Sequence, residues 1–215
     1  MKRKSQSYIL IGMVVLLVFL AYTASLTAVD RHPIGPNGSV VAYATVNRAV
    51  HDFFGVHLWL YHLTDWAGVV AIAVAFGFAV VGLVQWIQRR NIWRVDRSIL
   101  LLGAFYLLVF GVYVFFEYTV INYRPVLIYG FLEASYPSST TMLAACVLPT
   151  AMMQFKRLIR NRMVCRIVNG LCGVFTVFMV VGRLVCGVHW FTDIVGGLLF
   201  STAMVCLYYG AETAV

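Results

Sequence analysis

The sequence predicts an all-α membrane protein, a bundle of six transmembrane helices with both termini in the cytoplasm. Of its 215 residues, 62% are hydrophobic and only 11% are charged, whereas in soluble domains about 25% of residues are charged. The chain holds about six apolar runs, each close to the roughly 20 residues that a helix needs to cross a bilayer. Little is left over for a soluble domain, so we expect a single integral membrane domain, residues 1–215.

The N-terminal half contributes three of these spans. Residues 8–29 are too long an apolar run for a signal-peptide core and lack an A-x-A cleavage site, so we expect a retained helix. Residues 30–47 contain RHPIGPNG, whose prolines and glycines predict a loop. Residues 46–65 mix apolar with polar side chains, which predicts an amphipathic helix lying in the outer interface. Residues 67–86 and 98–118 are the second and third spans.

The C-terminal half contributes the other three. Residues 121–136 are expected to form an outer loop that contains an Arg-Pro pair. Spans four, five and six are predicted over residues 138–155, 163–185 and 190–209. An even number of spans places both termini on the same side of the membrane.

The basic residues indicate which side that is. The net charge is +8, and 12 of the 16 Lys and Arg residues precede the first span or lie in two alternate links. Cytoplasmic links carry such an excess, so the opposite, extracytoplasmic face of the plasma membrane is expected to hold the functional site. The basic charge therefore reflects topology and contacts with membrane lipids, and no nucleic-acid partner is expected. The twelve residues are Lys2, Arg3, Lys4, Arg89, Arg90, Arg94, Arg97, Lys156, Arg157, Arg160, Arg162 and Arg166.

The cysteines and most histidines do not indicate a cofactor. The five cysteines lie in or beside apolar runs, which is typical of small buried side chains rather than of a disulfide framework. His51, His57 and His62 are spaced six and five residues apart, which does not place them on one helical face. We therefore favour an interfacial helix over a metal site and expect neither a metal nor another cofactor. This segment can also act as a lid.

Residues 182–193, which read GRLVCGVHWFTD, carry the strongest functional signal. Ionisable residues at membrane depth are costly, so Arg183, His189 and Asp193 require a function or mutual pairing. His189 and Asp193 are four residues apart, a spacing that on a helix puts both side chains on one face. Asp193 is therefore expected to fix the tautomer of His189.

The predicted outer ends of other spans supply groups that suit phosphate. Arg124 and Arg183 offer planar donor forks that match phosphate oxygens. Ser138 and Ser139 follow a proline at a helix start, where free backbone N–H groups and the helix dipole favour an anion. Taken singly, each residue has a structural explanation; together on one side they predict a phosphate site in which His189 forms a phosphohistidine.

The stretch 182–193 resembles the third motif, SRxxxxxHxxxD, of the type 2 phosphatidic acid phosphatase superfamily, with Gly182 in place of its serine. These are six-helix membrane enzymes that remove phosphate from lipid phosphates and diphosphates and share a site design with vanadium haloperoxidases. The resemblance covers about residues 98–209. In the first motif, KxxxxxxRP, Glu117 stands where the family has Lys, and in the second, PSGH, Thr140 stands where the family has His.

The resemblance implies that His189 is the nucleophile, that Asp193 orients it, and that Arg124, Arg183 and the serines of the second motif hold phosphate. The second-motif His would protonate the leaving group, which Thr140 cannot do near pH 7. Glu133 is a candidate substitute acid.

The substrate and the activity follow from these departures. A diphosphate needs little leaving-group protonation, so a polyprenyl diphosphate is favoured over phosphatidic acid. Glu117 and Thr140 leave a second interpretation open, a catalytically impaired protein that binds or carries a lipid phosphate. A transporter is the third interpretation, but the spans contain no charged series to support it.

Overall fold

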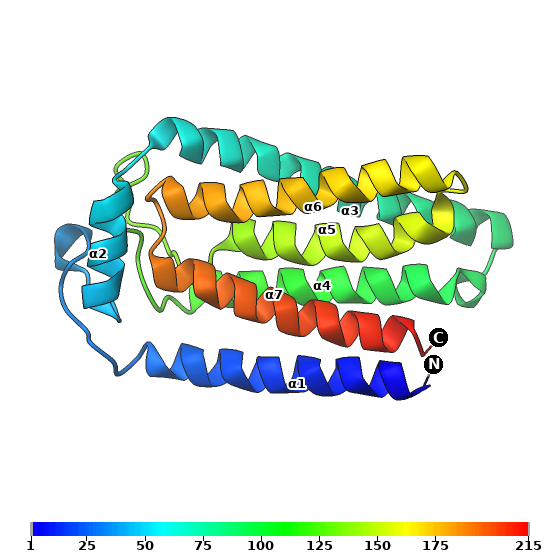
Figure 1. Cartoon of the computed structure of the whole chain (residues 1–215), viewed down its shortest axis with the longest axis horizontal. Helices are drawn as coiled ribbons and strands as arrows, with labels where there is room; N and C mark the ends of the chain where they lie inside the picture. Colours follow the sequence, from blue (N-terminus) through cyan, green and yellow to red (C-terminus); the bar gives the residue numbers. More distant parts are fainter. Residues whose placement is uncertain (1, 215) are drawn as a thin grey trace.

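The computed structural model describes residues 2–214 and confirms an all-helical architecture (Figure 1). Within this range only isolated β-bridges accompany the helices. The long helices run side by side, and the shorter α2 lies across one end of them. The α-helices are α1 (Lys2–Ser25), α2 (Ala44–Phe54), α3 (Leu58–Arg89), α4 (Arg97–Tyr118), α5 (Ser139–Leu158), α6 (Arg162–Val185) and α7 (Phe191–Glu212), with 3-10 turns at Pro36–Gly38 and Ile92–Arg94.

Five helices in the described range are long and apolar enough to cross a membrane, namely α1, α3, α4, α6 and α7. The sixth long helix, α5, is not among them. It packs against α3, α4, α6 and α7, and most of its side chains are buried. Buried polar residues of α5 make hydrogen bonds within the protein; for example, Gln154 Nε2 donates to Tyr208 Oη at 2.7 Å. A helix enclosed by other helices contacts little lipid, so it can be more polar than its neighbours.

The predicted interfacial helix over residues 46–65 is wrong as a single element. Helix α2 ends at Phe54, and Gly55 then adopts a positive φ of 69° that breaks the helix. Residues 58–65 instead form the first turns of α3, which has 32 residues and is therefore roughly 48 Å long. The amphipathic pattern continues across this break, so a prediction based on periodicity alone treated the two helices as one.

Helix α1 lies alongside α7 at the edge of the bundle (Figure 1). A Cβ at Gly12 would fall 2.7 Å from Leu207 Cγ, and one at Gly210 would fall 2.5 Å from Ile9 Cγ1. Ser5 Oγ also donates to the Gly210 carbonyl at 2.7 Å. Small residues on both helices thus allow the close backbone approach that is typical of membrane helix pairs.

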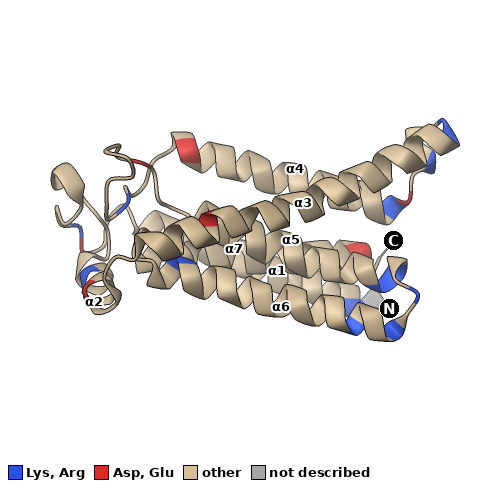
Figure 2. Cartoon of the chain, turned by 90° about the horizontal axis from the view of Figure 1, so that it is seen from above, with Lys and Arg blue, Asp and Glu red and all other residues tan. Residues whose placement is uncertain are grey.

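The two ends of the bundle differ in composition. Lys and Arg gather at the end where the termini lie (Figure 2). Ion pairs at this end include Arg157 with Glu212 at 3.0 Å and Arg89 with Asp96 at 2.8 Å. The other end carries α2 and the loops at residues 26–43, 119–138 and 186–190. These loops bring together the candidate site residues.

Candidate active site

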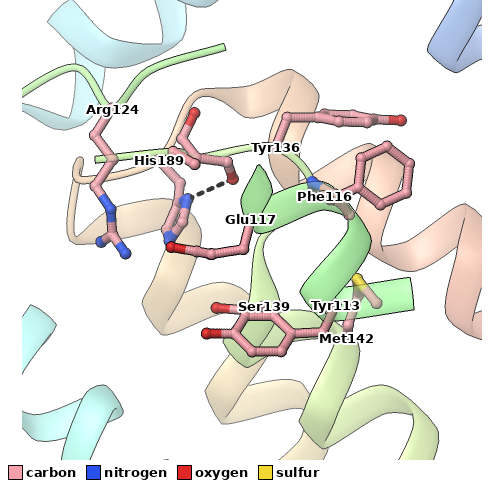
Figure 3. A pocket seen from close by; sticks show the side chains of 11 residues that line it. Tyr113, Phe116, Glu117, Arg124, Tyr136, Ser139, Met142 and His189 are labelled. Atoms are coloured by element: carbon pink, nitrogen blue, oxygen red, sulfur yellow. Dashed lines mark hydrogen bonds between the residues drawn. The ribbon is translucent and has the colours of Figure 1, made fainter. Parts of the chain in front are cut away.

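His189 lies in the α6–α7 loop and is only 4% exposed. Its Nδ1 is 3.2 Å from the carbonyl oxygen of Ser135, the contact drawn as a dashed line in Figure 3. A carbonyl oxygen can only accept, so Nδ1 must carry the hydrogen and donate it. The lone pair of His189 is therefore on Nε2, the atom that faces the guanidinium of Arg183.

The surroundings of His189 favour its neutral form. Burial is the largest cause that lowers the pKa of His189 well below its ordinary value of 6.5, followed by the positive charges of Arg124 and Arg183. The hydrogen bond to Ser135 acts in the opposite direction. A neutral imidazole with a free Nε2 lone pair is the form that can act as a nucleophile or a base.

Asp193 lies close to His189 but contacts it differently from the expectation. Its Oδ2 is 3.7 Å from His189 Nδ1 and instead accepts the backbone N–H of Trp190 at 2.8 Å. Since α7 begins at Phe191, His189 precedes the helix and the one-turn spacing does not apply to the pair. Asp193 thus caps the first turn of α7 and holds the loop, while Ser135 makes the direct hydrogen bond that fixes the imidazole.

Arg183, in the last turn of α6, is 1% exposed and directs its guanidinium at His189. Its Nη2 lies 3.4 Å from His189 Nε2 and 3.7 Å from Asp65 Oδ1. Its Nη1 is 3.3 Å from Thr64 Oγ1, and its Cζ lies 4.9 Å from the centre of the Tyr61 ring. Three side chains from the first turns of α3 therefore position Arg183.

Sequence reasoning missed these three α3 residues. The signal was present, because residues 61, 64, 65 and 68 share one face of a helix by their spacing of three and four. The mistaken helix boundary concealed it, because residues 61, 64 and 65 were assigned to the interfacial helix and residue 68 to the second span, whereas all four belong to α3.

Gly182 explains the absence of serine at the head of the third motif. A Cβ at this position would lie 2.7 Å from Thr64 Cγ2, closer than any ordinary contact. Thr64 is fully buried and its hydroxyl donates to the carbonyls of Leu60 and Tyr61 at 2.8 and 3.0 Å. Gly182 on α6 and Thr64 on α3 therefore fit one another.

Arg124 approaches the same space from the loop at residues 119–138. Its Nε lies 3.2 Å from Glu133 Oε2, and its backbone N–H donates to the Glu133 carbonyl at 3.0 Å. Its Cζ lies 5.8 Å from the centre of the Tyr61 ring. Arg124 Nη1 is buried and has no hydrogen-bond partner among residues 2–214. Both guanidiniums thus contact Tyr61, and Arg124 keeps a free donor.

The start of α5 forms another wall of the site. Ser138 is fully buried, and its backbone N–H donates to the Asp193 carbonyl at 3.1 Å while its hydroxyl accepts from Thr141 at 3.0 Å. Ser139 lines the cavity that contains His189. Thr140 faces α3, where a Cβ at Gly68 would lie 3.7 Å from its Cγ2. The first backbone N–H groups of α5 have no partner within the helix.

The cavity has a volume of about 80 Å³ (Figure 3). At roughly 10–15 Å³ per water, this volume holds several waters or a group the size of phosphate. Glu117, at the end of α4, points into the same cavity as His189. The lining residues are Tyr113, Phe116, Glu117, Arg124, Ala134, Ser135, Tyr136, Pro137, Ser139, Met142 and His189.

A larger cavity of about 620 Å³ adjoins the first one between α3, α4 and α5. The two cavities share Tyr113, Ser139 and Met142. The larger cavity is lined mainly by apolar side chains, and Asp65 is its one charged residue. A polar chamber at His189 is thus adjacent to an apolar groove along three long helices.

Helix α2 is hydrogen-bonded to the start of α7, next to the site. Asn47 is fully buried, donates from Nδ2 to Thr192 Oγ1 at 3.0 Å and accepts the Thr192 backbone N–H at 3.1 Å. A Cβ at Gly187 would lie 2.0 Å from the carbonyl oxygen of Gly55, so the α2–α3 turn rests directly on the α6–α7 loop. Sequence reasoning missed Asn47, whose partner is 145 residues away.

The three histidines considered above are dispersed. His57 Nε2 contacts the Phe54 carbonyl at 2.9 Å, His51 lies beside Trp190, and His62 lies beside Tyr61. Among residues 2–214, no three His, Cys, Asp or Glu side chains are grouped so as to hold a metal ion.

Comparison with known proteins agrees with the motif spacing. The family model described as the PAP2 superfamily matches residues 70–214. The chain belongs to the PAP2 superfamily. The resemblance inferred from residues 182–193 is thereby confirmed, and the PAP2 match includes every candidate residue from Glu117 to Asp193.

A solved PAP2 structure has a similar fold. It is described as the crystal structure of the first transmembrane PAP2 type phosphatidylglycerolphosphate phosphatase from Bacillus subtilis. The two chains superpose with a TM-score of 0.62 at 21% sequence identity, over 95% of this chain and 96% of the other. No curated protein matches the sequence. The likeness therefore shows that the PAP2 membrane fold extends over nearly the whole chain.

Proposed function

We propose that the protein is a membrane lipid phosphatase that hydrolyses a lipid-linked diphosphate or phosphate, most readily a polyprenyl diphosphate, through a phosphohistidine at His189. The observation that carries the proposal is the direction of the Nε2 lone pair. It faces Arg183 Nη2 at 3.4 Å, beside a phosphate-sized cavity that Arg124 also lines.

Each group has a defined task in this reaction. His189 Nε2 attacks the terminal phosphorus and the bond to the leaving lipid phosphate breaks, while the hydrogen stays on Nδ1 and is donated to the Ser135 carbonyl oxygen. Arg183, Arg124 and the free N–H groups at the start of α5 stabilise the charge on the phosphoryl oxygens in the transition state. Asp193 keeps the α6–α7 loop in place. Water then hydrolyses the phosphohistidine.

The leaving group decides which substrates react. Thr140 cannot donate a proton near pH 7, and Glu117 adds negative charge to the cavity where a lysine would add positive charge. A phosphate that leaves from a diphosphate is a weak base and departs with little help, whereas an alkoxide requires protonation. These two residues therefore favour diphosphates over phosphatidic acid.

The apolar groove suits the lipid tail. Its volume of about 620 Å³ lies between α3, α4 and α5, and Ser139 lines both this groove and the polar cavity. A headgroup at His189 would leave the tail in this groove, within the hydrocarbon layer. We take α5 as the sixth span, with the basic end and both termini in the cytoplasm and His189 at the extracytoplasmic side of the plasma membrane.

Phosphate release by purified protein tests the proposal. Wild type is expected to release phosphate from a polyprenyl diphosphate in detergent, and His189→Ala is expected to reduce release to the level of the protein-free reaction. His32→Ala serves as the matched control, because His32 is an exposed loop residue paired with Asp30.

A second candidate function is binding or carriage of a lipid phosphate without turnover, which Glu117 and Thr140 favour. It predicts that wild type retains the labelled lipid but releases no phosphate from any lipid phosphate or diphosphate. Release that depends on His189 would exclude it.

A further inference from the structure

We propose that Asp65 is the general base that activates the water in the second half of the reaction, the hydrolysis of the phosphohistidine. The inference rests on the proposed function. A good leaving group speeds formation of the phosphohistidine but does not assist its hydrolysis. In the hydrolysis, water must lose a proton as it attacks phosphorus, whichever group left in the first step. Thr140, at the second-motif position, cannot accept that proton.

The α3 backbone brings Asp65 to the second-motif position. Gly68 packs against Thr140, with 3.7 Å between its virtual Cβ and Thr140 Cγ2. Asp65 precedes Gly68 by three residues, which is one helical turn on the same face. Asp65, Ser139 and Thr140 accordingly line one cavity. A carboxylate from α3 therefore lies next to the position from which the family histidine is missing.

The distance from Asp65 to His189 suits a base in this step. Asp65 Oδ1 is 3.7 Å from Arg183 Nη2, which is 3.4 Å from His189 Nε2. Because both contacts share Nη2, Oδ1 lies within about 7 Å of Nε2, and a phosphoryl group on Nε2 with one water beyond it spans a similar distance. Arg183 would contact both the phosphoryl group and the base.

The other carboxylates near the site are less suited to this role. Asp193 is fully buried and accepts the Trp190 N–H, and Glu133 is paired with Arg124 at 3.2 Å. The side chain of Asp65 is 56% exposed and lies about two turns from the start of α3, so we place it near the membrane surface, where it can pass the proton on to interfacial water. Glu117 also lines the His189 cavity and is the one competitor for the role.

In the hydrolysis step the water oxygen forms a bond to phosphorus while the phosphorus–Nε2 bond breaks. The electron pair of the broken bond returns to Nε2 of His189. One water proton passes to the Asp65 carboxylate and from there to solvent. Inorganic phosphate leaves, and His189 regains its neutral form with hydrogen on Nδ1.

Rapid-quench measurement with a polyprenyl diphosphate labelled in its terminal phosphate tests the inference. In Asp65→Asn we expect phosphohistidine to form at a rate near that of wild type and to decay about 100-fold more slowly or more. Labelled enzyme should therefore accumulate. Asp65→Glu should restore most of the decay rate. Asp52→Asn, an exposed α2 variant, is the matched control and should decay like wild type.

Chemical rescue separates loss of the base from structural damage. Formate added to Asp65→Ala should accelerate decay of the phosphohistidine, which a merely disrupted Arg183 contact would not allow. Decay at the wild-type rate in Asp65→Asn would overturn the inference, as would accumulation in Glu117→Gln instead. If wild type itself releases no phosphate or forms no phosphohistidine, the proposed function fails, which is a distinct result.

Discussion

The two sides of the His189 cavity differ in how their polar groups are held. On the third-motif side, His189 and Arg183 are almost fully buried, and Ser135, Thr64 and Asp65 contact their nitrogen atoms. On the side of the first and second motifs, Glu117 and Thr140 replace a lysine and a histidine, and the wall opens into the apolar groove.

This contrast separates two chemical tasks. In the proposed reaction, the buried side holds neutral His189 as the nucleophile against the fixed positive charge of Arg183, which is what attack on phosphorus requires. The open side would assist the leaving group, and Thr140, at the position of the family's acid, cannot donate a proton near pH 7. The protein is therefore expected to retain phosphoryl transfer while depending on the substrate for departure of the leaving group.

The largest effect is expected from Arg183→Lys, which alters the buried side. Lysine keeps the charge but cannot reach His189, Thr64 and Asp65 together, so we expect kcat/KM to fall about 100-fold to 1,000-fold. Arg31→Lys, at an exposed loop position, is the matched control. Steady-state phosphate release measures both variants. Near-wild-type activity of Arg183→Lys would contradict the role of the Arg183 guanidinium in stabilising the transition state.

A stability effect is expected from Gly182→Ser, which restores the family residue. Its Cβ would lie 2.7 Å from Thr64 Cγ2, and such overpacking costs about 1–3 kcal/mol. Thr64→Ser removes that methyl group and keeps the hydroxyl bonded to Arg183, so the double variant should recover stability. Thermal unfolding in detergent tests this, and equal losses in the single and double variants would contradict the packing explanation.

A shift in pH dependence is expected from Arg124→Gln. In the proposed mechanism neutral His189 is the reactive form, so activity is expected to fall as the pH drops through the pKa of His189. Wild type should keep its kcat/KM below pH 6.5, because burial and the two arginines lower this pKa. Loss of one positive charge raises the pKa of His189, so the acid limb should move upward. Arg48→Gln, an exposed control, should match wild type, and an unshifted limb in Arg124→Gln would contradict this electrostatic account.

The smallest effect is expected from Thr140→His, which adds a proton donor to the open side. We expect faster hydrolysis of lipid monophosphates and little change with diphosphates, since only the former needs leaving-group protonation. Paired assays of phosphate release measure the difference. No gain with monophosphates would mean that the residues around position 140 fit threonine and do not let a histidine there reach the leaving group.

The same contrast describes what the sequence could predict. Arg183, His189 and Asp193 were found because a local motif fixes their spacing, and the all-helical fold followed from apolar run lengths. Tyr61, Thr64, Asp65 and Asn47 were not found, because they join the site through contacts more than a hundred residues away.

Two local rules also failed for physical reasons. Gly55 ends a helix within an unbroken amphipathic pattern, and residues 58–65 were therefore placed outside α3. His189 lies before the first turn of α7, so its spacing to Asp193 did not produce the expected hydrogen bond. The helix predicted over residues 138–155 is present as α5, Ser139–Leu158, and it can carry polar residues because other helices enclose it.

Comparison of a lipid diphosphate with a monophosphate of the same tail measures how far the reaction depends on the leaving group. Purified wild type, with His189→Ala as background, is assayed for kcat/KM on both. We expect a preference for the diphosphate of about 100-fold or more, because Thr140 supplies no proton to a departing alkoxide. Comparable His189-dependent turnover of the two substrates would contradict it.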